Sequence, residues 1–116
     1  MYMDELKETL YDLHARIMKA LAHPRRLMIM DQLHEGPKTV SELVALLDLP
    51  QANVSQHLAA IREQGIVVAH RQGNTVSYSL PDLRIVEACD LFRGFLADRI
   101  RKNQNLADQM ELIRTT

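Results

Sequence analysis

Apolar residues recur at every third or fourth position along much of the chain, a spacing that predicts amphipathic helices. The first stripe predicts a helix over about residues 4–22. His23-Pro24 interrupts this stripe, and Pro24 suits the first position of a second helix, which ends at Gly36-Pro37. The first stripe consists of Leu6, Leu10, Leu13, Ile17 and Leu21, and the second of Leu27, Ile29, Met30 and Leu33.

Capping and turn residues predict two further helices. Thr39 and Glu42 have the spacing of a capping box, in which the two side chains satisfy free backbone N–H groups at a helix start. Asp48-Leu49-Pro50 then turns the chain into a fourth helix over about residues 51–64. Gly65 suits the left-handed position that follows a helix end. The apolar positions of the third helix are Leu43, Leu46 and Leu47.

The pattern changes after residue 65. Ile66–Arg71 and Thr75–Leu80 are β-type segments on either side of Gln72-Gly73-Asn74, which predicts a hairpin. Pro81-Asp82 opens a last helix, although Asn103–Asn105 weakens the middle of its pattern. The predicted fold is mainly α with a β-hairpin wing, in the order α-α-α-α-β-β-α. The last stripe consists of Ile85, Cys89, Phe92, Leu96 and Ile100, and Leu106, Met110 and Ile113 continue its spacing.

Two short helices joined by a tight turn and followed by a hairpin are the plan of a winged helix-turn-helix. If Val54, Leu58 and Ile61 point inward, the step of about 100° per residue places other side chains of the fourth helix on its far side. Gln and Asn side chains hydrogen-bond base edges, and alanines allow a helix to approach DNA closely. The outer set is Ala52, Gln56, Ala59 and Glu63, flanked by Asn53 and Ala60.

The remaining polar residues of this region suit contacts with the DNA backbone. Ser55 lies nearer the edge of the face, where a hydroxyl can meet a phosphate. His57 lies closer to the core side, so packing or a phosphate contact suits it better than base reading. The other reading of the fourth helix is a solvated polar face, because most helices of small domains have one. The candidate DNA-binding residues are Gln51, Asn53, Ser55, Gln56, His57, Arg62, Arg71 and Asn74.

The length and charge of the chain bear on its number of domains and on how it binds DNA. The chain has 116 residues, which suits a single domain over residues 1–116, and its formal net charge is −1. Residues 1–12 carry a net charge of −3, whereas residues 49–79 carry +1. We therefore expect DNA binding that depends on dimerisation and polar base contacts and that fades readily with salt. An acidic N-terminus without a signal-peptide pattern and the lack of a long apolar run predict a cytoplasmic protein with no membrane partner.

Five segments of the chain carry a recognisable pattern when they are taken together: Leu21–Ile29, Thr39–Leu43, Leu49–Leu58, Ile61–Val67 and His70–Leu80. In this order and spacing they resemble the ArsR/SmtB family of bacterial winged-helix repressors. The resemblance covers roughly residues 15–95 and implies a homodimer that binds a double-stranded DNA operator. It implies that the helices at residues 1–22 and 82–116 form the dimer seam, that residues 39–64 are the helix-turn-helix, and that residues 66–80 are the wing. The tip Gln72-Gly73-Asn74 lacks the basic residues that relatives often carry.

The family's two common metal sites are missing their ligands here. The cysteine-containing site of the third helix falls on Lys38–Glu42, which has no thiol. In the site of the last helix, Asp82 and Asp98 fit the acidic positions, but Arg84 and Phe95 occupy the histidine positions. We therefore expect no metal and no cofactor, and the inducer stays unknown.

Cys89 is the only cysteine, and its place on the apolar stripe of the last helix favours a small packed side chain. The alternative is a thiol- or redox-responsive repressor acting through Cys89. Family members that sense oxidants pair two cysteines of one chain, so this alternative needs a second subunit or a covalent modification. A second alternative is a winged-helix module that contacts proteins and not DNA. No phosphate loop, paired catalytic carboxylates or nucleophile–base motif points to an enzyme.

Overall fold

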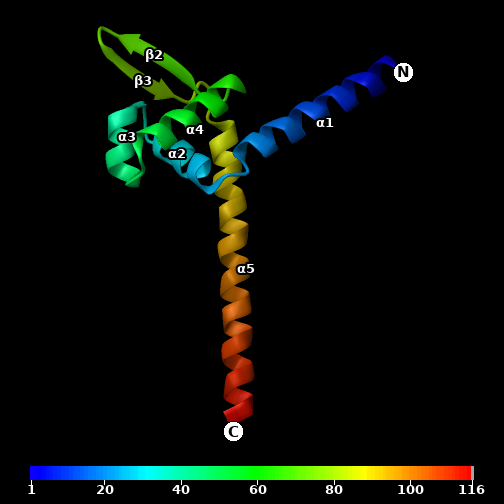
Figure 1. Cartoon of the computed structure of the whole chain (residues 1–116). Coiled ribbons are helices and arrows are strands. Elements are labelled where there is room, and N and C mark those ends of the chain that lie inside the picture. Colours follow the sequence, from blue (N-terminus) through cyan, green and yellow to red (C-terminus); the bar gives the residue numbers. More distant parts are fainter. Residues whose placement is uncertain (116) are drawn as a thin grey trace. The chain divides into compact units, whose positions relative to one another are not determined.

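The computed structural model describes residues 1–115 and divides them into two units. The first unit, Met1–Leu83, holds four helices and a small sheet, and the second is a single helix (Figure 1). The predicted order of elements is confirmed, with one short strand added. The elements are α1 (Tyr2–Leu21), α2 (Pro24–His34), β1 (Lys38–Thr39), α3 (Val40–Leu47), α4 (Gln51–Glu63), β2 (Val68–Gln72), β3 (Thr75–Ser79) and α5 (Arg84–Thr115).

The core of the first unit lies among α2, α3 and α4, which pack against one another. It contains no aromatic side chain, in keeping with the shortage of aromatic residues in the sequence. Of the three apolar leucines of α3, Leu43 is fully buried, whereas Leu46 is 55% exposed. The buried residues of the unit are Leu21, Ile29, Met30, Leu33, Leu43, Leu49, Val54, Leu58, Ile61, Ile66 and Val67.

Local interactions fix the start of α3 and the turn that follows it. At the start of α3, the Glu42 backbone N–H donates to the Thr39 hydroxyl over 3.1 Å, and the Thr39 N–H donates to the Glu42 carboxylate over 3.1 Å. These bonds hold the pKa of the Glu42 carboxyl below its usual 4.5. Asp48 adopts a left-handed conformation (φ 52°) and turns the chain toward α4.

The end of α4 is a Schellman motif. The N–H of Ile66 donates to the Ile61 carbonyl over 3.0 Å, and that of Gly65 donates to the Arg62 carbonyl over 2.9 Å. Gly65 has a φ of +75°, which a residue with a Cβ rarely adopts. The predicted helix stop is therefore confirmed, and the last helical residue is Glu63.

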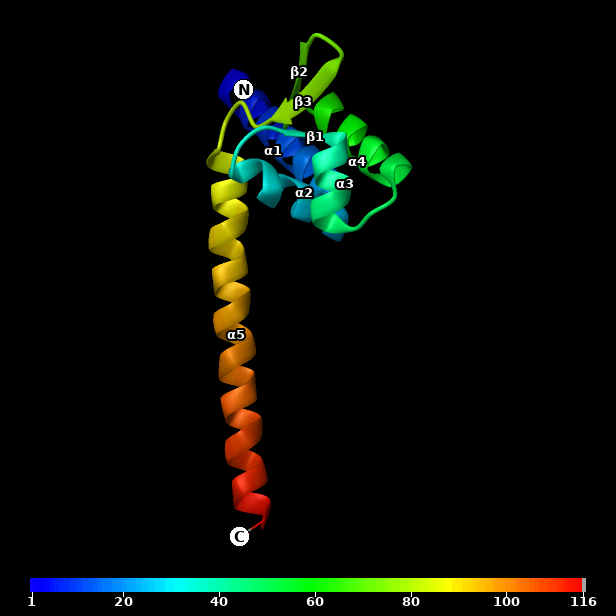
Figure 2. The same cartoon turned by 90° about the vertical axis from the view of Figure 1, so that its left-hand side faces the viewer.

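The sheet is antiparallel, with strand order β1-β3-β2 (Figure 2). The sequence pattern did not reveal β1, because two residues are too short to show alternation. The hairpin is also tighter than predicted. Ile66 and Val67 are core residues outside the strand, and Gln72 pairs with Thr75, which leaves Gly73-Asn74 as the turn. Gly73 has a φ of +64°, as the first residue of a two-residue hairpin turn requires.

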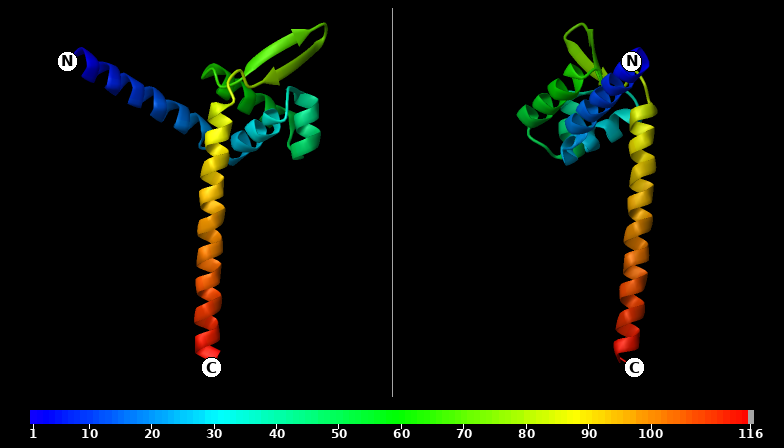
Figure 3. Two further views of the ribbon diagram at one scale, coloured as in Figure 1. Left: turned by 180° about the vertical axis from the view of Figure 1, so that it is seen from behind. Right: turned by 90° about the vertical axis from the view of Figure 1, so that its right-hand side faces the viewer.

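The two terminal helices leave large apolar side chains exposed. The N-terminal turns of α1 extend away from α2, α3 and α4 (Figures 1 and 3), and Leu6, Leu10 and Leu13 are 45–65% exposed. Along α5, Phe92 is 60% exposed and Ile113 is 74% exposed. The helix continues through Asn103–Asn105, where the sequence pattern was weak.

Candidate nucleic-acid interface

The predicted inner and outer faces of α4 are confirmed. Val54 and Ile61 are fully buried and Leu58 is 1% exposed, so this stripe fixes the rotation of the helix about its axis. Four polar site residues predicted from the sequence lie exposed on the rest of the helix, and their side chains form no hydrogen bond with the part of the chain that is described. Donors and acceptors are therefore available to an outside partner. These residues are Gln51, Asn53, Ser55 and Gln56.

The exposed basic side chains of the interface lie on two elements. Arg62 is in the last turn of α4, and Arg71 is on β2 of the wing, which projects from the helices (Figure 3). Neither guanidinium forms an ion pair within residues 1–115. Glu63 is also exposed and brings one negative charge to the same region. The surface is therefore mildly basic, and its positive charges are free to meet phosphates.

His57 differs from the other predicted site residues because it is half-buried and held by another side chain. The Nε of Arg26 donates to the Nδ1 of His57 over 3.1 Å, and the rings of His23 and His57 lie 6.1 Å apart. Burial lowers the pKa of His57, and the positive charges of Arg26, His23 and Arg25 lower it further. The surroundings of the ring therefore disfavour its protonation.

Sequence reasoning missed the link between Arg26 and His57. The two residues are 31 positions apart, and no local periodicity connects an arginine in the first turn of α2 with a histidine in α4. The only available signal was that His57 sits toward the core side of its helix, where a polar ring needs a hydrogen-bond partner.

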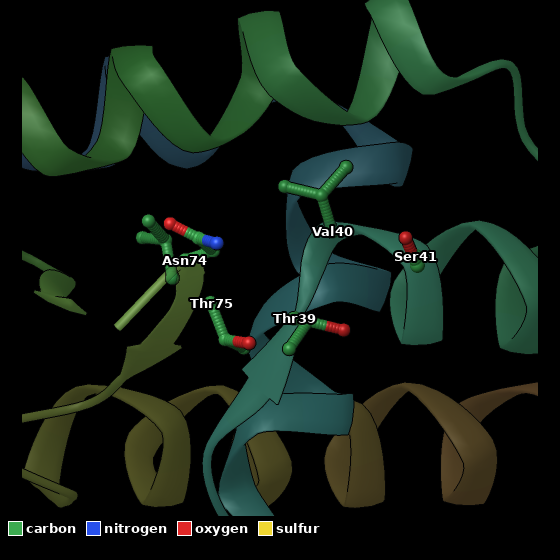
Figure 4. Close-up of a pocket in the computed structure, with 6 residues that line it drawn as sticks. Thr39, Val40, Ser41, Asn74 and Thr75 are labelled. Carbon is green, nitrogen blue, oxygen red and sulfur yellow. The ribbon is translucent and has the colours of Figure 1, made fainter. Parts of the chain in front are cut away.

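A hollow of about 370 Å³ separates the start of α3 from the tip of the wing (Figure 4). In Figure 4, Asn74 and Thr75 of the hairpin lie on one side, and Thr39, Val40 and Ser41 lie on the other. The hydroxyl and amide groups on its walls can accept and donate hydrogen bonds. Asn74 is a predicted DNA contact, whereas Ser41 and Thr75 carry no signal in the sequence that marks them for this site.

Other kinds of site have less support. Within residues 1–115, no group of three or more His, Cys, Asp or Glu side chains is arranged to hold a metal ion. Cys89 is a free thiol on α5 and is half-buried. None of the helices over this range has the length and apolar character needed to cross a membrane.

The arrangement defines the class of protein. Helices α3 and α4 pack against each other, and the paired strands β2 and β3 follow them. A helix pair of this kind with an adjoining hairpin is a winged helix-turn-helix, whose second helix enters the major groove of DNA.

Comparison with known proteins gives the family. The pattern of the arsR family of bacterial regulatory proteins matches residues 23–68. The uncharacterized HTH-type transcriptional regulator Rv0081 of Mycobacterium tuberculosis is 40% identical over 91 residues, which are 78% of this chain and 80% of that protein. The biofilm growth-associated repressor of Agrobacterium fabrum is 42% identical over 77 residues, which are 64% of this chain and 66% of that protein.

Solved structures of related proteins support the same family. The crystal structure of Rv0081 has a TM-score of 0.72 at 37% identity and covers 81% of this chain and 95% of its own. The homodimeric winged helix-turn-helix DNA-binding domain Mb0332 of Mycobacterium bovis has a TM-score of 0.74 at 28% identity, and the match covers 83% of this chain and 89% of that domain. The chain belongs to the arsR family of bacterial regulatory proteins and is a DNA-binding transcriptional regulator.

Proposed function

We propose that this protein is a homodimeric repressor that reads a double-stranded DNA operator with α4 of each subunit. The exposed, unpaired polar face of α4, opposite a fully buried apolar stripe, is the observation that carries this proposal. Gln56 and Asn53 read base edges, since amide side chains pair with adenine in the major groove. Gln51, Ser55 and His57 contact phosphates or sugars at the edge of the same face.

The wing supplies backbone contacts beside the major groove. Arg71 on β2 and Arg62 at the end of α4 each place a free positive charge against a phosphate. Asn74 at the turn adds an uncharged donor and acceptor. Because each subunit brings only these two exposed arginines in residues 49–79, tight binding depends on pairing two subunits.

The dimer forms through residues 1–22 and 82–116, so that the whole chain works as one DNA-binding domain. Apolar side chains exposed at helical spacing on α1 and α5 support this, since soluble monomers rarely expose long apolar stripes. The homodimeric state of the Mycobacterium bovis relative supports the pairing of two subunits. Repression, as opposed to activation, is inferred from the Agrobacterium fabrum relative, which is a repressor.

The regulator acts in the cytoplasm and has no catalytic role, resident metal or cofactor. Lys38–Glu42 lacks a thiol, and Arg84 and Phe95 replace imidazoles, so neither of the family's common metal sites has its ligands.

Selection from a random DNA library tests this function. Duplexes of about 30 base pairs span two half-sites one helical turn apart, so a dimer should enrich an inverted repeat from such a library. The same duplex should then shift in a gel, less so as salt rises. Failure to enrich any sequence would contradict the proposal and favour the alternative of a winged-helix module for protein contacts, with Glu63 on its exposed face.

A further inference from the structure

The guanidinium of Arg26 joins two helices that are separate in the sequence. It lies in the first turn of α2 and is half-buried. Its Nη1 donates to the carbonyl oxygen of Ala20 in the last turn of α1 over 2.9 Å. Its Nε donates to the Nδ1 of His57 in α4 over 3.1 Å. One rigid, planar group therefore connects the end of α1 with α4.

The bond to Ala20 has a clear physical reason. The last four carbonyls of an α-helix have no partner within the helix, and a positive charge there is favourable. Arg26 satisfies one of these carbonyls and brings that charge. The anchored end of the guanidinium then leaves Nε directed at the second partner, because the five donors of arginine have a fixed fork geometry.

The bond to His57 fixes the state of the imidazole. Since Nδ1 accepts a hydrogen from Arg26, the proton of the neutral ring must be on Nε2. Protonation of Nδ1 would break the bond. Burial of the ring, and then the nearby Arg26, His23 and Arg25, lower the pKa of His57 and so disfavour that protonation. In the described chain, Nε2 has no hydrogen-bond partner. His57 therefore has one N–H donor, on the side of the ring away from Arg26.

We propose that Arg26 is a positioning residue for DNA recognition: it holds His57 as the Nε2–H tautomer, ready to donate to a DNA phosphate, and ties α4 to the end of α1. This inference rests on the proposed function, in which α4 reads DNA and α1 pairs the subunits. Through the carbonyl of Ala20, the placement of the reading helix is coupled to the helix of the dimer seam. Arg26 contributes through geometry, in contrast to Arg62 and Arg71, which contribute charge.

Neighbouring residues offer matched variants. Arg26→Lys keeps the positive charge but loses the fork that makes both bonds. Arg25→Gln removes the charge of the adjacent arginine, which is exposed and makes no side-chain hydrogen bond within residues 1–115. His57→Gln keeps an N–H donor at the edge of α4 but removes the ring that Arg26 holds.

The first measurement needs no DNA. Long-range ¹H–¹⁵N spectra of the full chain near neutral pH distinguish the two tautomers of each histidine. The wild type and Arg25→Gln should show His57 with one protonated and one unprotonated nitrogen, in the Nε2–H form. Arg26→Lys should show shifts averaged between the two tautomers. A wild-type ring that already averages, or carries its proton on Nδ1, would overturn the proposal even if Arg26→Lys fails to fold.

The second measurement uses the duplex selected from the random library by the wild type. Loss of a charged hydrogen bond should lower the affinity of Arg26→Lys about tenfold or more at every salt concentration, with the salt dependence unchanged. His57→Gln should cost a similar factor, and the double variant should cost little more than either alone. Additive losses would overturn the coupling of the two residues. A wild type that selects no duplex would refute the proposed function. The NMR measurement of the His57 tautomer would then still show whether Arg26 fixes the protonation of the ring.

Discussion

Replacing Arg71 by Ala should weaken DNA binding through charge alone. Each subunit presents two free arginines in residues 49–79, so a dimer presents four. Counterion release then gives a slope of log K against log salt of about −3.6, and Arg71→Ala should reduce it to about −1.8. Between about 50 and about 200 mM salt, affinity should fall about 150-fold for the wild type and about 12-fold for the variant.

Fluorescence anisotropy with a labelled duplex over that range of salt measures both slopes. Gln72→Ala is the matched control, because it truncates an exposed, uncharged side chain next to Arg71 on the same strand and should leave the slope unchanged. Arg71→Ala should also weaken binding to the selected and to unrelated sequences by the same factor. An unchanged slope in Arg71→Ala would refute the reasoning that the wing contributes a phosphate contact.

Four further predictions concern folding and regulation. Leu58→Ala should lower the free energy of unfolding by about 2–5 kcal/mol in urea titrations. Leu58 is 1% exposed, so its truncation leaves a cavity in the core beneath the DNA-reading face of α4. Thr39→Ala should lower it by about 1 kcal/mol through loss of the cap. Since the pKa of Glu42 is lowered, its carboxylate stabilises the fold above pH 4.5, and this stabilisation is lost as the pH falls below that value. In Glu42→Gln, the free energy of unfolding should therefore depend less on pH in this acid range. Oxidants should leave DNA affinity unchanged in the wild type and in Cys89→Ser; a large loss in the wild type that Cys89→Ser abolishes would revive the thiol-responsive alternative.

The sequence predicted the helix-turn-helix well because its signals are local. The capping box at Thr39, the left-handed turn at Asp48 and the glycine after α4 each depend on neighbouring residues. The inner stripe of α4 follows from helical periodicity, so the exposed positions of Gln56 and its neighbours followed as well. Helix α5 continues through Asn103–Asn105, where the sequence pattern was weak, and Gln104 donates to Asp108 over 3.1 Å across the next turn.

Features that depend on tertiary contacts were not predictable. Strand β1 exists because Lys38 and Thr39 pair with Tyr78 and Ser77 of a distant strand. The bond between Arg26 and His57 likewise joins residues on two helices, and it changes the role of His57 from a generic polar side chain to a ring with a defined proton. The exposure of Leu46 depends on which face of α3 its neighbours cover.

The most direct test of the account compares the base preferences of the wild type and Gln56→Ala by selection from the same random library. Gln56 is exposed on the reading face and has no partner within the described chain, so its amide is free to read a base. The wild type should select an inverted repeat, and Gln56→Ala should lose preference at one base pair of each half-site, by about 1–3 kcal/mol, while its salt dependence stays unchanged. The same base preference in both proteins, or a uniform loss across all sequences, would contradict the claim that α4 reads the operator through this face.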